Sequence, residues 1–178
     1  ISGSAGNHTN DQIGIMKEWG FDDVHELTGP MASTGSDSPY TDYLKEKGTL
    51  PDFRKYCLEY VIRVSMKRTG SIPEVFQGAI EKYGIEIDVN SDELWLEPPL
   101  PLPPEDHYDS YVGWKTIEWI ENYQKEDPFF MMVGFTGPHS PFDAPAEYQE
   151  PYHQMDLPLG IMDPPVEPIP EFVEQLMK

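Results

Sequence analysis

The sequence is poor in cysteine, in basic residues and in long apolar runs, and each of these shortages excludes something. Cys57 is the one cysteine, so the chain has no internal disulfide and the redox compartment stays open. Twelve Lys and Arg face 32 Asp and Glu, which gives a formal net charge of −20. A chain this acidic is expected to bind no nucleic acid, because phosphate contacts depend on basic side chains. No apolar run reaches the length of about 18 residues that a transmembrane helix needs, so none is expected.

Proline, by contrast, is abundant. The chain has 178 residues, a length that suits one domain, but 19 of them are prolines and only 38% are hydrophobic. Two Pro-rich stretches, residues 97–104 and 163–170, lack many backbone donors and favour polyproline II. We expect both to run as extended connectors over the surface and to contribute nothing to the core.

Apolar residues at helical spacing predict the helices. The pattern indicates a short helix over Asp11–Trp19, closed by Gly20, and a long one over Leu50–Thr69, closed by Gly70. Residues 72–83 could form another. A further helix is predicted over residues 107–124, with Asp106 as its N-terminal cap.

A seven-residue apolar run, Phe129–Phe135, follows the last of these helices. It opens after Pro128 and shows no alternation, which predicts a strand buried on both faces, as in a parallel sheet. A second strand is predicted over Phe21–Leu27. A helix followed by a buried strand favours an α/β fold. One stripe of the preceding helix would lie on the sheet: Val112, Thr116, Trp119, Ile120 and Tyr123.

The turn after the buried run carries the leading functional candidate, His139. In open α/β sheets ligands bind beyond the carboxyl ends of the strands, and residues 136–139 are the first segment past that end. The alternative is a structural turn histidine whose ring bonds a backbone carbonyl. Asp143 is expected to cap the turn, with a place in a substrate pocket as the alternative.

These residues resemble a known family. Pro128-Phe-Phe, the apolar run and then Pro138-His-x-Pro-Phe-x-Ala-Pro145 with Tyr148 are similar to the central signature of the sulfatases, the formylglycine-dependent branch of the alkaline phosphatase superfamily. Gly20-Phe21-Asp22, and Tyr40–Leu44 followed by Gly48, resemble other segments of the family. The resemblance covers most of the chain and is strongest over residues 105–152.

The resemblance implies an alkaline-phosphatase-like α/β fold, with a mixed, mainly parallel sheet flanked by helices. It also implies hydrolysis of a sulfate monoester by a hydrated formylglycine, assisted in the complete enzyme by a divalent cation, usually calcium. His139 aligns with a histidine that donates a hydrogen bond to a sulfate oxygen. His8 could lie near the same pocket, because it follows the expected position of a Lys-x-His motif, although a solvated loop histidine is the simpler interpretation.

Several family motifs are missing from the sequence: the Cys/Ser-x-Pro-x-Arg that yields formylglycine, an early acidic pair, the Lys-x-His and a late Asp-Asn/His pair. Cys57 lacks the proline and arginine that its conversion requires, so it is not expected to be the nucleophile. We therefore expect residues 1–178 to form a single partial domain, the middle of a sulfatase catalytic domain. Its partners would be the remainder of that domain and a small sulfated substrate, and the chain alone should hold no metal and show no activity.

The other candidates have structural interpretations. His25, His107 and His153 show no metal-ligand spacing and are expected to be structural or exposed. Asp22 and Asp23 are expected to form a turn and a strand start and not a metal pair.

The tryptophans Trp95, Trp114 and Trp119 are expected in the core or an interface.

Two rival functions stay open, a phosphonate or phosphodiester hydrolase of the same superfamily and a non-catalytic binding domain derived from such an enzyme.

Overall fold

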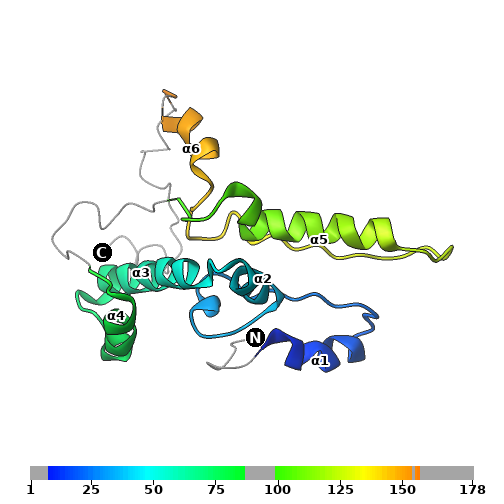
Figure 1. Cartoon of the computed structure of the whole chain (residues 1–178), viewed down its shortest axis with the longest axis horizontal. Coiled ribbons are helices and arrows are strands. Elements are labelled where there is room, and N and C mark those ends of the chain that lie inside the picture. The colour runs from blue at the N-terminus through cyan, green and yellow to red at the C-terminus, as the bar shows by residue number, and fades with distance from the viewer. Residues whose placement is uncertain (1–7, 87–98, 154, 157–178) are drawn as a thin grey trace, which may run out of the picture. The chain divides into compact units, whose positions relative to one another are not determined.

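The protein is described by a computed structural model that covers residues 8–86, 99–153 and 155–156. It divides into two compact units, Ile1–Ala146 and Glu147–Lys178, which we describe separately. Regular structure in the described residues is helical (Figure 1). None of the described helices is both long and apolar enough to cross a membrane.

The first unit begins with a short 3₁₀ turn, η1 (Thr9–Gln12), that continues into α1 (Ile13–Glu18). The backbone of Gly20 follows at a φ of +98°, where a side chain would be strained. This confirms the predicted helix and its glycine stop. A second 3₁₀ turn, η2, covers Ala32–Thr34.

Helix α2 (Pro39–Lys47) starts at a capping box. The Ser38 side chain accepts from the Thr41 N–H, while the Thr41 hydroxyl accepts from the Ser38 N–H at 2.7 Å. The helix ends at Gly48, which adopts the left-handed conformation at a φ of +78°. Both ends are therefore specified by local sequence.

Helix α3 spans Leu50–Thr69 and ends at Gly70, at a φ of +70°. These are the bounds that the sequence predicts. Residues 72–83 form η3 (Glu74–Phe76) followed by α4 (Gln77–Tyr83), so the helix predicted there exists in two pieces. A small core lies between α3 and the segment that contains η3 and α4. Its buried residues are Leu58, Ile62, Met66 and Ile85.

The larger core lies between α2, α3 and α5 (Tyr108–Asn122). Its members are buried aromatic and aliphatic side chains: Tyr40, Leu44, Leu50, Phe53, Tyr56, Cys57, Leu100, Tyr108 and Tyr111. Tyr40 sits at its centre, with its ring edge-on to Phe53 at 5.4 Å and tilted against Tyr111 at 5.2 Å. Such ring contacts add specificity to apolar burial.

Leu100 corrects the prediction for the Pro-rich stretch at 97–104. Its side chain is only 5% exposed and belongs to the larger core, and Leu102 packs against the same cluster. Both leucines therefore contact the core, while Pro99, Pro101 and Pro103 remain exposed. The stretch at 163–170 lies outside the described residues.

The cap of α5 also differs from the prediction. A short turn, η5 (Pro104–Asp106), precedes the helix, and His107 caps it by accepting the Asp109 N–H on Nδ1 at 3.2 Å. Asp106 is buried, and its carboxylate accepts from the Tyr43 hydroxyl and the Lys47 ammonium. The N-cap position belongs to His107, and the Asp106 carboxylate contacts Tyr43 and Lys47 instead.

The predicted strands Phe21–Leu27 and Phe129–Phe135 are not formed in the described part of the chain. After α5 the chain turns back along the helix, with Phe129 against Trp119 and Tyr123 (Figure 1). A strand needs a neighbour with free backbone groups, whereas those of a helix are paired internally. The side chain of Phe130 in this segment is 81% exposed.

The helix stripe that the sequence predicts against a sheet instead contacts irregular segments: Trp119 and Tyr123 meet Phe129, and Trp119 also bonds Asp23. Val112 is buried, but Ile120 is 48% exposed. The pairing that the described residues do contain is an isolated parallel bridge between His8 and Asp37.

The described part of the second unit is mainly α6 (Ala146–His153), which contains Pro151 near its end. Its tyrosines, Tyr148 and Tyr152, are both exposed.

Candidate functional site

His139 lies on a tight turn in the described structure. Its N–H donates to the Thr136 carbonyl at 3.0 Å, which closes a four-residue turn with Pro138 at the third position. The peptide bonds Gly137–Pro138 and Ser140–Pro141 are both cis. The His139 side chain is exposed.

The ring of His139 has one committed nitrogen. Nδ1 lies 2.6 Å from the carbonyl oxygen of Ser140. Because a carbonyl oxygen only accepts, Nδ1 must carry a proton. The neutral ring then presents Nε2 as an acceptor, and the charged ring presents it as a donor. Among the described residues Nε2 has no partner, so it is available to a ligand.

Helix α5 holds the start of this turn through Asp109, in its first turn. The carboxylate accepts the N–H of Thr136 on Oδ1 at 2.7 Å and the N–H of Gly137 on Oδ2 at 3.1 Å. A β-carbon on Gly137 would lie 2.7 Å from Oδ2, so the approach depends on a glycine there. A carboxylate is favoured at this end of a helix by the exposed N–H groups and the helix dipole.

Asp143 anchors the other end of the segment. It is 2% exposed, its Oδ1 accepts from the Tyr108 hydroxyl, and its backbone carbonyl accepts from the Leu100 N–H at 3.3 Å. Oδ2 has no donor among the described residues. Burial, and then the bond to Asp143, raises the pKa of Tyr108, so its hydroxyl stays protonated and donates.

We call residues 136–143 the His139 loop. Two consecutive residues of α5, Tyr108 and Asp109, hold it on either side of His139. Both residues belong to the first turn of α5, which packs on the larger core, so the exposed imidazole is attached to a well-packed part of the structure.

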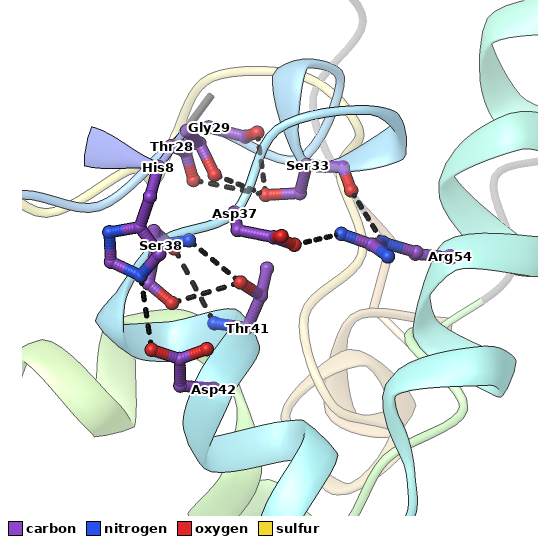
Figure 2. A network of polar contacts seen from close by, with 9 residues as sticks. All are labelled: His8, Thr28, Gly29, Ser33, Asp37, Ser38, Thr41, Asp42 and Arg54. Atoms are coloured by element: carbon purple, nitrogen blue, oxygen red, sulfur yellow. Dashed lines mark hydrogen bonds and ion pairs between the residues drawn. The ribbon is translucent and has the colours of Figure 1, made fainter. Parts of the chain in front are cut away.

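His8 lies in a separate network (Figure 2). Its Nε2 is 3.0 Å from an Asp42 oxygen on α2, and its Nδ1 accepts the Asn10 N–H at 2.9 Å. Beside it Asp37 pairs with Arg54, whose Nε also donates to the Ser33 carbonyl at 3.1 Å. The hydrogen bonds of His8 run to Asp42 and Asn10, and those of Arg54 run to Asp37 and Ser33, none of which belongs to the His139 loop.

A cavity of about 270 Å³ opens beside the His8 network. Its lining comes from the segment before α2, from α2 itself and from the start of α3: Asp37, Asp42, Lys45, Gly48, Leu50, Pro51 and Arg54. His139 and Asp143 do not line it. The lining contains two acidic and two basic side chains, and Arg54 is paired with Asp37, so it carries no excess of positive charge that would favour an anion.

The remaining histidines have structural contacts where their side chains are described. His25 bonds the Tyr111 hydroxyl at 2.9 Å, and His107 caps α5. The side chain of His153 lies outside the described part. Cys57 is 1% exposed, and burial raises its pKa, which keeps it a thiol.

The described residues contain no group of three or more His, Cys, Asp or Glu that could hold a metal ion. Asp23 sits in an irregular segment and accepts from Trp119 Nε1 at 3.4 Å. Trp114 packs on the larger core, as expected, and Trp95 lies outside the described residues.

The contact of Asp109 with the His139 loop is not among the features that the sequence predicts. Its signal was present, since an acidic residue in the first turn of a helix often satisfies free N–H groups. The partner amides lie 27 residues further on, however, and no local pattern connects them.

Comparison with known proteins agrees with the resemblance around His139. The sequence model of the Sulfatase family matches residues 3–163, and the chain belongs to this family. It is thereby a member of the alkaline phosphatase superfamily of hydrolases, whose fold is α/β and whose sulfatase members are generally metal-dependent.

Two relatives match parts of the chain. An arylsulfatase of Clostridium perfringens (strain 13 / Type A) is 30% identical over 83 residues, which are 47% of this chain and 17% of that protein. The multifunctional alkaline phosphatase superfamily protein PehA of Trinickia caryophylli is 25% identical over 99 residues, 49% of this chain and 19% of that protein. The match thus spans less than a fifth of either relative. No solved structure matches the chain significantly.

Proposed function

We propose that this protein belongs to an enzyme that hydrolyses sulfate monoesters, and that the His139 loop supplies part of the wall that binds the sulfate group. The observation that carries the proposal is the exposed imidazole of His139, with Nδ1 committed to a carbonyl and Nε2 free among the described residues. Family membership supports a sulfate ester as the substrate class.

The hydrogen bond of Nδ1 supports a particular mode of anion binding. Nδ1 keeps its proton for the Ser140 carbonyl, so Nε2 donates to a sulfate oxygen only when the ring is charged. A charge-assisted hydrogen bond of this kind is about twice as strong as a neutral one. It would also offset part of the negative field of a chain whose net charge is −20.

The described residues do not provide the rest of the chemistry. None of their acidic and histidine clusters suits a divalent cation, and Cys57 is a buried thiol. The formylglycine nucleophile and the cation, calcium by family analogy, would be held elsewhere in the sulfatase domain. We therefore expect residues 1–178 alone to hydrolyse no sulfate ester.

The test is His139→Ala in the full-length protein, assayed on a chromogenic aryl sulfate. Loss of one preorganised donor to developing negative charge costs about 10²-fold in turnover, and we expect a loss of that order. The thermal unfolding midpoint should stay unchanged, because the ring is exposed. Unchanged turnover would remove His139 from the site.

His8→Ala is the matched control. It removes a second histidine, and its ring bonds Asp42 without any described contact to the His139 loop. Turnover close to that of the unmodified protein is expected. A loss comparable with that of His139→Ala would place both histidines at one pocket.

A phosphodiester or phosphonate hydrolase is the second candidate. It is favoured by the relative described as a multifunctional member of the alkaline phosphatase superfamily. The relative kcat/KM of the full-length protein on matched aryl sulfate, phosphodiester and phosphonate substrates decides between the two. A higher value for either phosphorus ester would replace the sulfatase assignment.

A further inference from the structure

We propose that Asp109 is a positioning residue for His139, acting through the backbone of the His139 loop and not through contact with substrate. The proposal rests on the proposed function, because it assigns Asp109 a purpose only if His139 binds the sulfate group. It is carried by the contacts of one half-buried carboxylate with two consecutive amides.

Two consecutive N–H groups converge on Asp109. Thr136 donates at 2.7 Å and Gly137 at 3.1 Å to the two oxygens of one carboxylate. Two bonds to one rigid group fix both the position and the direction of the chain, as one bond would not. The same turn is closed by the His139 N–H on Thr136, so orienting Thr136 orients the backbone of His139.

Gly137 shows how close this approach is. An added β-carbon would lie 2.7 Å from the Asp109 oxygen, well inside van der Waals contact. The φ of Gly137 is not positive, so the requirement for glycine there is one of space and not of backbone conformation. The pair Asp109 and Gly137 therefore forms a matched contact that substitutions on either side can test.

The His139 loop is held at two points, by Tyr108 at Asp143 and by Asp109 at Thr136 and Gly137. Asp143 is fixed from the core by Tyr108, below the loop, and is fully buried. Asp109 holds the loop at Gly137, which is exposed and lies two residues before His139. Loss of the Asp109 contacts should free this end of the loop while the core stays intact.

A purely electrostatic role predicts the opposite result from a positioning role. Asp109→Asn removes a negative charge near an anion site, which by itself would strengthen sulfate binding. If the carboxylate orients the loop, the same change weakens sulfate binding, because the neutral amide keeps one acceptor and can hold only one of the two N–H groups. The sign of the change in affinity for inorganic sulfate separates the two roles.

The experiment uses the full-length protein with Asp109→Asn, His139→Ala and the double variant, and measures kcat/KM on an aryl sulfate and the inhibition constant of inorganic sulfate. Asp109→Asn should lower kcat/KM about tenfold or more, since misplacement of a binding group by a fraction of an ångström has costs of that order. It should raise the inhibition constant, and it should add no loss to His139→Ala. Glu118→Gln, the same charge change on the same helix, should leave both quantities unchanged.

Each other outcome has a definite meaning. Full activity of His139→Ala overturns the proposed function. A damaged His139→Ala beside a fully active Asp109→Asn overturns the positioning role alone. Losses that multiply in the double variant, or tighter sulfate binding in Asp109→Asn, also overturn it, because Asp109 would then act independently of His139 or through charge.

Amide hydrogen exchange tests the contact without any activity. In Asp109→Ala the amides of Thr136 and Gly137 should exchange faster while those of α3 keep their protection, and unchanged exchange would overturn the proposal. If this variant does not fold, Gly137→Ala replaces it. Its β-carbon should displace the carboxylate and reproduce the losses of Asp109→Asn, and full activity of Gly137→Ala would contradict the close approach.

Discussion

Tyr108→Phe should destabilise the protein although it removes a single oxygen. The Tyr108 hydroxyl donates to Oδ1 of Asp143, and no other side-chain donor among the described residues lies within hydrogen-bonding distance of that carboxylate. His107 Nε2 lies 3.8 Å from Oδ1, which is too long for a hydrogen bond. The ring of Tyr108 is 3% exposed and keeps its packing in the phenylalanine variant. The change therefore isolates a buried carboxylate.

The expected magnitude follows from comparison with a second tyrosine. A hydrogen bond to a charged group contributes about 1.5–3 kcal/mol, and a buried acceptor left unpaired costs a similar amount. We expect Tyr108→Phe to lower the free energy of unfolding by about 2–3 kcal/mol. Tyr43→Phe also removes a hydroxyl from a buried aspartate, but Asp106 keeps its ion pair with Lys47, so we expect a loss below about 1 kcal/mol.

Urea unfolding followed by tryptophan fluorescence measures the difference. The two variants should show the same slope against denaturant, so that a shift in midpoint reports stability. Equal losses in the two variants, or a larger loss in Tyr43→Phe, would refute the argument that the remaining donor on each aspartate decides the cost.

Two further predictions concern the backbone and alkaline pH. Gly48→Ala should lower the free energy of unfolding by about 1–2 kcal/mol, because the φ of Gly48 is +78°. Gly78→Ala inside α4 should raise the free energy of unfolding by about 0.5–1 kcal/mol, because alanine has the higher helix propensity. Urea midpoints that move in the same direction for the two variants would contradict this. Burial, and then the charge of Glu118, raises the pKa of Tyr111 from 10.0 to about 12. The unfolded chain therefore loses this proton first, so the stability that Tyr111 contributes is complete below pH 10 and is lost as the pH rises towards about 12. Tyr111→Phe should show a smaller loss of stability over that range, and an equal loss would contradict the assignment.

The helices could be predicted because their signals are local. Apolar spacing and a closing glycine define Leu50–Thr69 to the residue, and the same logic finds the helix before Gly20. The sequence predicts Asp106 as the cap of α5 because aspartate is a common cap, but Lys47 and Tyr43, about 60 residues earlier, bind that carboxylate. Sequence patterns do not report such distant competitors.

The prediction of a strand over Phe129–Phe135 was wrong for a related reason. The run Phe129–Phe135 has strand composition, yet a strand exists only with a neighbour, and the described neighbour is α5. The position of His139 on a turn after this run was predictable from proline and glycine. The base that holds it was not, because Asp109 and Tyr108 contact the loop across 27 and 35 residues.

The exposed run also has a consequence for handling the protein. Phe130 and Met132 are 81% and 76% exposed, and no backbone hydrogen bond joins Phe129–Phe135 to another described segment. A short apolar segment without charge and with open backbone groups is a template for intermolecular β-pairing and aggregation. Glu126, Asp127 and Pro128 precede it and act as gatekeepers on one side. When residues 1–178 are expressed by themselves, solubility should therefore depend on this run, and charged substitutions within it should delay self-association.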